Sequence, residues 1–326
     1  MEWNHKTVET KIGINFKNSD TLRLALMHRS YAQQVGEPEN HNERLELLGN
    51  AIFNFVITDY LYHNCPYLTV SNLSALRNKL LEGERLTKLW FQLGLGEAYP
   101  FLGMAQERHI LRKKSQNPFV DALEALVGAI HLDRGFSQTR NWLTKNLIAP
   151  LLERHLKSSK KRSSATKQLK FLGDSLLRAI ITDYLYCHLP SVSVSRLTDL
   201  FKELSSSEKQ AEYASQITTE DLLLAGENKE NVPVKSLKNL LAAMYIENNA
   251  TDPKSSFSKT SEWFVNRYID GDEVLQKAIT LLLEEGKPQK WIIREVMGYE
   301  SKDYHEGRDR FNNLVQEPES EESISS

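Results

Sequence analysis

Hydrophobic residues gather in two stretches of the chain without the alternation typical of a strand. Positions 45–61 are apolar nearly all round when they are placed on a helix, and VDALEALVGAIHLD at 120–133 has the same character. A helix that is apolar on every side is typical of one that other helices enclose. Helix-forming residues dominate both stretches, and Pro and Gly fall between the apolar segments. The pattern predicts an all-α protein.

The apolar pattern occurs twice along the chain. The hexapeptide ITDYLY stands at 57–62 and again at 181–186, an offset of 124 residues. Farther along, LEALVGAIHLD at 123–133 resembles LKNLLAAMYIE at 237–247 at an offset of 114. The second copy is therefore shorter between these two points. An internal repeat of this length predicts two related domains in one chain.

Polar positions suggest where the helices begin and where the domains end. VSNLSAL at 70–76 and VSRLTDL at 194–200 keep the offset of 124, and we expect Ser71 and Ser195 to be N-caps because each precedes an apolar-periodic run. The expected parts are 1–156 as a first helical domain, 157–164 as a basic linker, 165–250 as a shortened second domain, 259–315 as a C-terminal helical module and 316–326 as a disordered acidic tail.

Composition narrows the environment more than the function. The net charge of -2 does not indicate a nucleic-acid binder by itself, because the acidic tail offsets basic residues elsewhere. The two cysteines, Cys65 and Cys187, are too few for a disulfide framework or a CxxC metal site and fit a reducing compartment. The amino-terminal residues lack the pattern of a signal or transit peptide, and no run approaches about 18 apolar residues. We expect a cytoplasmic protein without a membrane partner.

A polar stripe interrupts each of the two apolar helices. Glu43, Glu46 and Asn50 are spaced i, i+3 and i+7, which places them on one helix face. Asp121 and Glu124 are spaced i and i+3 on the other helix. If the two faces meet, four or five oxygen ligands converge, and oxygen-only ligands suit Mg²⁺ or Mn²⁺ rather than zinc. The sequence therefore predicts a candidate divalent-metal site.

A structural alternative for these carboxylates stays open at this point. Burying an unpaired carboxylate is costly, so each must be paired, protonated, solvated or bound to a cation. The side chains could cap helices or form ion pairs with Arg44 and Arg77.

Three stretches of the chain resemble the motifs of the ribonuclease III family. They are HRSYA at 28–32, NERLELLGN at 42–50 and DALEALVGAIHLD at 121–133, in the family's order and at suitable distances. The second is close to the family's nine-residue signature, which is highly specific. The resemblance is good over about 6–155 and degenerate over 165–250. It implies two all-helical endonuclease domains that pair about a pseudo-dyad and cleave both strands of double-stranded RNA.

The resemblance also assigns the catalytic metal ligands. They would be Glu46, Asn50, Asp121 and Glu124, holding Mg²⁺ (or Mn²⁺) to activate a water and to neutralise the scissile phosphate. Asn50 departs from the family, which has Asp there, and a further acidic position of the family falls near Val70. Because Asn50 has lost the negative charge, we expect the first domain to be weakened or inactive as a nuclease.

In the second copy the same four positions are Lys170, Asp174, Lys235 and Lys238, and the flanking acidic position is Lys167. A pocket with lysines at these places would not concentrate Mg²⁺, but it could bind an RNA phosphate directly. The alternative is neutral drift, with Asp174 paired to Lys238. We expect the second domain to be degenerate and to lack catalytic activity.

Pairing is expected within the chain. In the ribonuclease III family an apolar residue beside the signature Glu packs across the dyad, and Leu47 and Phe171 occupy that position here. Two copies in one chain suggest an intramolecular pseudo-dimer, and a homodimer through the first copy is the alternative. Either arrangement would offer a groove sized for an RNA duplex.

Two basic segments are further candidates for contact with RNA phosphates. One is ERHILRKK at 107–114, with Arg112, Lys113 and Lys114, and the other is the linker, with Lys160, Lys161 and Arg162. The linker could equally be a solvated connection. No segment resembles the double-stranded-RNA-binding domain that usually follows this catalytic unit. Within the C-terminal module, the pattern at 272–314 predicts three short amphipathic helices, interpreted as an appendage that braces the second domain or as a helix-turn-helix-like module.

The resulting hypothesis is a protein that binds structured or double-stranded RNA in RNA processing or maturation, with Mg²⁺-dependent endonuclease activity weakened or lost. It is similar to plant organellar splicing factors that contain two degenerate ribonuclease III domains. One alternative is an active Mg²⁺-dependent endoribonuclease that uses the first domain. Another is a ribonucleoprotein or ribosome-associated scaffold.

Overall fold

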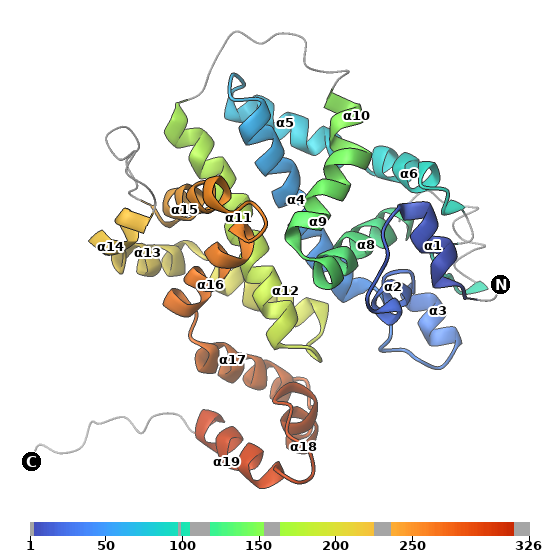
Figure 1. Ribbon diagram of the computed structural model, residues 1–326. Helices are drawn as coiled ribbons and strands as arrows, with labels where there is room; N and C mark the ends of the chain where they lie inside the picture. Colours follow the sequence, from blue (N-terminus) through green and yellow to red (C-terminus); the bar gives the residue numbers. More distant parts are fainter. Residues whose placement is uncertain (1–2, 97–98, 105–117, 153–163, 225–235, 316–326) are drawn as a thin grey trace, which may run out of the picture.

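The computed structural model describes residues 3–96, 99–104, 118–152, 164–224 and 236–315, and these parts of the chain are built from helices (Figure 1). Within them no pair of extended strands forms a sheet, and only Met27 and Phe101 meet in an isolated bridge. The predicted all-α fold is confirmed. None of the described helices is both long enough and apolar enough to cross a lipid bilayer.

The first repeat is organised around two apolar helices, α4 and α8. Its helices are α1 (His5–Ile12), α2 (Ser19–Ala25), α3 (Arg29–Gln34), α4 (Glu43–Asn64), α5 (Val70–Leu80), α6 (Gly83–Gln92), α8 (Pro118–Arg134), α9 (Phe136–Leu143), the π-helix η2 (Thr144–Ile148) and α10 (Ala149–Leu152). Helix α4 crosses α8 at Gly49, where an added Cβ would lie 1.7 Å from the carbonyl oxygen of Glu124. Only glycine permits so close an approach of the two backbones.

The second repeat is organised in the same way around α11 and α15. Its helices are α11 (Ala165–His188), α12 (Val194–Leu204), α13 (Ser207–Ser215), α14 (Thr219–Leu224) and α15 (Leu237–Thr251). A Cβ added at Gly173 would lie 1.8 Å from the carbonyl oxygen of Lys238. Gly173 follows Gly49 by the repeat offset of 124. The helix crossing that positions the site in the first repeat is therefore reproduced in the second.

The two repeats pack against each other through α4 and α11, and one continuous apolar core includes residues of both. Arg44 on α4 donates hydrogen bonds to carbonyl oxygens that follow the end of α11 or lie in its last turn: Val192, Leu189 at 3.0 Å and Tyr186 at 3.2 Å. Gln168, the equivalent of Arg44, reciprocates across the dyad. The predicted intramolecular pseudo-dimer is confirmed.

The reciprocal contacts of Gln168 end on the first repeat. Its Nε2 donates to the carbonyl oxygens of Pro66, at 3.0 Å, and Leu68, at 2.9 Å, just beyond α4. Arg77, meanwhile, lies over the Phe171 ring at 5.0 Å and donates to Thr58. The hypothesis that Arg44 and Arg77 pair with the site carboxylates is wrong, because both guanidinium groups are used between the repeats.

The helix starts expected at Ser71 and Ser195 are also wrong. The N-caps are Thr69 for α5 and Ser193 for α12, whose side chains accept hydrogen bonds from the backbone N–H groups of Asn72 and Arg196. Each helix begins at the preceding valine, so the serine lies inside the first turn. Thr69 and Ser193 still differ by 124 residues, so the repeat extends to its caps.

The C-terminal region consists of α16 (Ser256–Tyr268), α17 (Gly271–Glu284), α18 (Gln289–Trp291), the π-helix η3 (Ile292–Val296) and α19 (Tyr304–Val315). Helix α16 packs on α15 as α9 packs on α8. Its FSKTSEWF at 257–264 matches FSQTRNWL at 136–143 at an offset of 121. We therefore propose that the second domain continues through α16, beyond the expected boundary at residue 250.

Among the remaining helices, α17 contacts the second repeat, and α19 packs on α17. Helix α17 packs on α12, and Arg196 forms an ion pair of 2.6 Å with Glu285 just after α17. Lys277 on α17 forms another ion pair with Glu203 on α12. These contacts favour the bracing interpretation of the C-terminal module. The basic linker, apart from Ser164, and the acidic tail lie outside the described residues.

Candidate functional site

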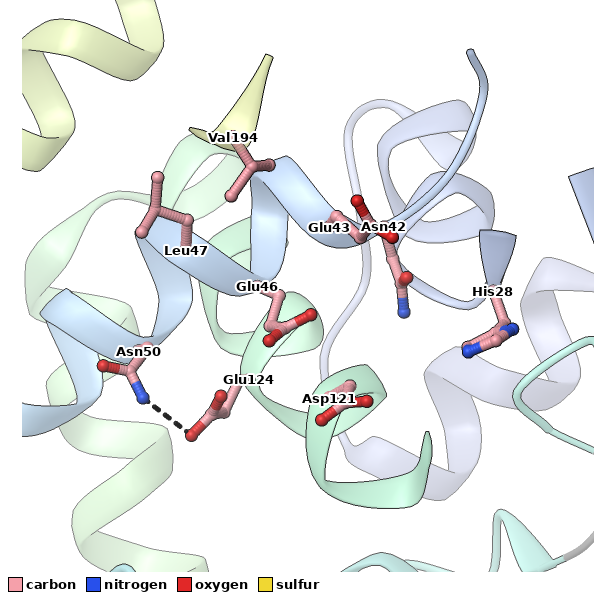
Figure 2. Close-up of a pocket in the computed structure, with 9 residues that line it drawn as sticks. All are labelled: His28, Asn42, Glu43, Glu46, Leu47, Asn50, Asp121, Glu124 and Val194. Carbon is pink, nitrogen blue, oxygen red and sulfur yellow. Dashed lines mark hydrogen bonds between the residues drawn. The ribbon is translucent and has the colours of Figure 1, made fainter. Parts of the chain in front are cut away.

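The predicted acidic stripes meet where α4 crosses α8. Figure 2 shows Glu46 and Asn50 from α4 facing Asp121 and Glu124 from α8 across one pocket of about 420 Å³. Glu43 lines the same pocket. The tight crossing at Gly49 holds the two backbones close enough for the side chains to converge. The structure thus brings together all the residues predicted for the metal site, although whether they hold a metal stays a prediction.

Other residues line the pocket that the sequence did not single out. His28 and Asn42 lie on its first-repeat side, and Val194 at the start of α12 closes the other side beside Leu47 (Figure 2). Val194 belongs to the second repeat, so the pocket needs both copies. Its position follows from the repeat pairing, because Val194 is the equivalent of Val70, where the family has an acidic residue.

Burial and mutual repulsion raise the pKa of the pocket carboxylates. Burial is the largest cause for Glu46, whose pKa is raised to about 8, and the neighbouring Asp121 and Glu124 add to it. Burial also raises the pKa of Glu124 to about 7, against the opposing effect of a hydrogen bond from Asn50. The pKa of Asp121 is raised as well, first by burial and then by Glu43. Such a cluster is stabilised by protons or by a cation.

Helix ends offset part of this repulsion. Glu43 and Glu46 lie in the first turn of α4, and Asp121 lies in the first turn of α8. The partial positive charge at a helix N-terminus favours carboxylates there. Outside the pocket, Arg29 approaches Glu43 at 3.4 Å. The carboxylates thus lie near helix starts, and this position is compatible with a metal site, whereas their role as helix caps stays a prediction.

Asn50 presents its amide nitrogen to the pocket, and a chain of hydrogen bonds fixes this orientation. Asn54 Nδ2 donates to the backbone carbonyl of Asn50 at 2.9 Å and to Asn50 Oδ1 at 3.3 Å. Because a backbone carbonyl can only accept, Asn54 must turn its NH₂ group toward Asn50. Asn50 Oδ1 then faces Asn54, and Asn50 Nδ2 donates to Glu124 Oε1 at 2.9 Å (Figure 2).

This orientation decides how well the pocket suits a divalent cation. Glu46, Asp121 and Glu124 supply carboxylate oxygens, the ligands that Mg²⁺ and Mn²⁺ prefer. Asn50 supplies a hydrogen-bond donor, which cannot coordinate a cation and which occupies a lone pair of Glu124. Within the described residues, no three acidic, histidine or cysteine side chains already form a metal-binding cluster. Three members of the predicted set fit a cation, and the fourth does not.

Sequence reasoning missed Asn54. Its spacing of four residues from Asn50 places it on the same face of α4, and that signal is visible in the sequence. What the spacing does not reveal is the direction of the Asn50 amide, which depends on the backbone carbonyl that Asn54 contacts.

In the second repeat, the described equivalent positions combine lysines with one aspartate. Lys167 and Lys170 have exposed side chains, whereas Lys238 forms an ion pair of 2.5 Å with Asp174. The pairing of Asp174 with Lys238, considered as an alternative, is therefore present. It engages Lys238, one of the lysines predicted to contact phosphate, whereas Lys170, another of them, and the flanking Lys167 are exposed.

The other predicted phosphate-binding residues are not covered by the structure. Lys235, the segment with Arg112, Lys113 and Lys114, and the segment with Lys160, Lys161 and Arg162 lie outside the described residues.

Comparison with known families matches both repeats. Residues 18–151 match the family described as Ribonuclease-III-like, and residues 167–259 match the Ribonuclease III domain family. The second match extends into α16, in agreement with the likeness of α16 to α9.

Individual relatives match less than half of this chain. Ribonuclease 3 of Borreliella burgdorferi is 37% identical over 132 residues, 40% of this chain and 53% of that protein. Ribonuclease 3 of Pseudomonas paraeruginosa is 40% identical over 144 residues, 43% of this chain and 59% of that protein. The matched region thus spans between half and three fifths of these relatives.

Solved structures with a similar sequence include the nuclease domain of ribonuclease III from Campylobacter jejuni. One structure is 32% identical with a TM-score of 0.39, covering 44% of this chain and 98% of that domain. Another is 30% identical with a TM-score of 0.40, covering 48% of this chain and 99% of that domain.

Proposed function

Because the chain belongs to the ribonuclease III family, we propose that it binds double-stranded or otherwise structured RNA in RNA processing, with its Mg²⁺-dependent endonuclease activity weakened or lost. The relatives are named ribonucleases, but this chain matches only 53% and 59% of their length. The activity and the substrate of this chain are therefore inferences.

The observation that carries the proposal is the hydrogen bond from Asn50 Nδ2 to Glu124 Oε1. In the family this position carries a carboxylate, which would add a ligand and a negative charge. Here an uncharged amide donates a hydrogen bond to one oxygen of Glu124 and supplies no negative charge. The amide therefore competes with a cation for Glu124, which has its other oxygen, Oε2, left for coordination.

If a divalent cation enters, Glu46, Asp121 and Glu124 would hold it. The ion would supply an activated water and neutralise charge on the scissile phosphate. The chain's own contribution is to keep the three carboxylates within one pocket whose lining contains no lysine or arginine. Mutation of a residue that only supports a metal ligand typically costs about 10- to 100-fold in metal affinity or activity. Losing one charged ligand should lower cation affinity and activity by at least as much.

RNA binding is supported by the paired architecture and by the second repeat. Where the first repeat has Glu43 and Glu46, the second has exposed Lys167 and Lys170. Ammonium groups attract phosphates without reading base sequence, so we expect affinity for duplex shape and strong dependence on salt.

A cleavage assay with a labelled RNA duplex and Mg²⁺ or Mn²⁺ tests the catalytic part. We expect little or no cleavage by the natural chain, and at least about tenfold faster cleavage by Asn50→Asp. The double variant Asn50→Asp with Glu124→Gln is the control, in which the gained activity should disappear. Metal-dependent cleavage by the natural chain that is as fast as that of Asn50→Asp and is lost in Glu124→Gln would instead establish a working endoribonuclease, the alternative that the three remaining carboxylates favour.

A binding assay tests the RNA part separately. Fluorescence anisotropy with the same duplex, without divalent ions, should show affinity that falls steeply with salt. Reversing Lys167 and Lys170 to Glu should weaken binding at least tenfold, whereas Lys6→Glu on α1, remote from these lysines in the sequence and equally exposed, should not. If the chain did not bind the duplex, or if the double reversal left its affinity unchanged, the result would favour a scaffold that acts through protein contacts.

A further inference from the structure

The pseudo-dyad relates two clusters of polar side chains, one at Asp59 on α4 and one at Asp183 on α11. An arginine side chain occupies the cluster at Asp59. On α4, Asp59 is 5% exposed; its Oδ1 lies 3.0 Å from His63 and its Oδ2 lies 3.7 Å from Arg140 Nη1. The same Arg140 nitrogen donates to Asn249 Oδ1 at 2.9 Å and to the Tyr245 hydroxyl at 3.4 Å. The guanidinium group thus joins α9 of the first repeat to α15 of the second.

The repeat offsets identify the mate of this cluster. Asp183 follows Asp59 by 124 residues, and His131 precedes Tyr245 by 114. His131 Nε2 lies 3.1 Å from Asp183 Oδ1, so this contact also joins the two repeats. The match of FSQTRNWL with FSKTSEWF then places Ser261 where the first cluster has Arg140.

The substitution of serine for arginine leaves a cavity. Its volume is about 520 Å³, and its lining includes His131, Phe136, Asp183, Phe257, Ser261 and Glu262. Asp183 Oδ2, the equivalent of the oxygen that faces Arg140 in the filled cluster, has no hydrogen-bond or ion-pair partner among the described residues. Asp183 therefore lacks the counterpart of Arg140, because Lys254, which also lines the cavity, forms no ion pair with it.

The lining selects for a cation that also carries apolar surface. Asp183 and Glu262 repel anions, and the buried rings of Phe136 and Phe257, stacked at 4.7 Å, offer apolar and aromatic contact. A cavity this large has room for an alkyl chain besides the charged group. We propose that it binds a small organic cation, a guanidinium or primary ammonium compound, whose charge faces Asp183.

The proposal is independent of RNA binding and of cleavage, and binding to the intact chain tests it. The probe is agmatine, which carries a guanidinium and a primary ammonium group, and butylurea is its uncharged counterpart. Calorimetry should show one agmatine per chain and no binding of butylurea, and agmatine should raise Tm by at least about 2 °C.

Two substitutions locate the site. Ser261→Arg should fill the cavity as Arg140 fills its mate, so agmatine binding should fall at least tenfold while the variant stays folded. Asp183→Asn should weaken binding at least tenfold by removing the facing charge. Arg140→Ser is the matched variant that opens the mate cluster; it should lower Tm, and agmatine should bind at a second site and restore part of the loss.

Three results would overturn the proposal. They are no agmatine binding by the natural chain, binding that Ser261→Arg leaves unchanged, and equal binding of butylurea. Lys254 also lines the cavity and is the competing cation. If Lys254→Gln lowered Tm as much as Arg140→Ser and only this variant bound agmatine, the cavity would be filled by the chain's own lysine.

Discussion

Gly49 in the first repeat and Gly173 in the second let two helices cross with their backbones almost in contact, yet the side chains around the two crossings have opposite charge. The first crossing gathers Glu46, Asp121 and Glu124, while the second exposes Lys170 and pairs Lys238 with Asp174. The backbone arrangement is thus kept independently of the chemistry placed on it. Shape and site can be tested separately, and the predictions below do so.

The largest expected effect concerns the shared crossing. Gly49→Ala and Gly173→Ala should each lower the free energy of unfolding by about 3 kcal/mol or more, because the new Cβ would overlap a backbone carbonyl oxygen that has little room to move. Urea denaturation measures the change. Gly83→Ala on α6 is the control, since its Cβ would meet only Val120 at 3.8 Å. Losses below about 1 kcal/mol at both crossings would contradict the equivalence.

The next largest effect on stability should come from the contacts that Arg44 and Gln168 make between the repeats. Arg44→Ala should cost about 2 kcal/mol, because it leaves three carbonyl oxygens without a charged donor, and Gln168→Ala about 1 kcal/mol. Arg44→Gln places the second repeat's residue in the first and should recover part of the loss. If the two alanine variants were equally stable in urea, the charge of Arg44 would contribute nothing.

The acidic crossing should also respond to pH in a way that the basic one does not. The pKa of Glu46 in the folded protein is about 8, against an ordinary value of 4.5, so the folded state binds more protons and stability falls as pH rises between these values. Without divalent ions we expect a loss on the order of 1 kcal/mol from pH 5.5 to 8.5, reduced by solvent screening. Glu46→Gln should flatten the curve in thermal melts, whereas Lys170→Gln, at the equivalent position, should leave its slope unchanged.

The smallest expected effect is on the orientation of Asn50. Asn54→Ala removes the donor that holds Asn50 Oδ1 away from the pocket, so the amide can turn and offer its oxygen to a cation. Affinity for Mn²⁺, measured by calorimetry, should rise about two- to tenfold, within the range of outer ligand-shell effects. Asn64→Ala is the control, because Asn64 makes the same contact one turn back, to Tyr60, far from the pocket. A fall in affinity would contradict the orientation.

The helices and their pairing were predictable because burial leaves a periodic record in the sequence. Residues 45–61 lie within α4, and the spacing placed Glu46 and Glu124 on one face of each apolar helix. That the two faces meet was implied by the resemblance to the ribonuclease III family. The N-caps at Thr69 and Ser193 were missed because serine and threonine occur at neighbouring positions, and only backbone geometry distinguishes them.

Features that depend on several distant contacts could not be predicted in the same way. The inter-repeat role of Arg44 requires the relative placement of α4 and α11. The likeness of α16 to α9 was overlooked because its offset, 121, differs from those of the neighbouring segments. The cavity beside Asp183 lies where Ser261 replaces the arginine of the other repeat, and a single small residue of this kind leaves no periodic pattern in the sequence.

The contacts of Arg44 and Gln168 have a consequence for how this chain can change over generations. Each copy supplies the groups that complete the other's longest helix, so a gene fragment encoding either copy alone would encode a domain with an uncovered face and unsatisfied carbonyl oxygens. The second copy can lose every metal ligand and still be indispensable to the first. Its persistence in the chain needs no activity of its own.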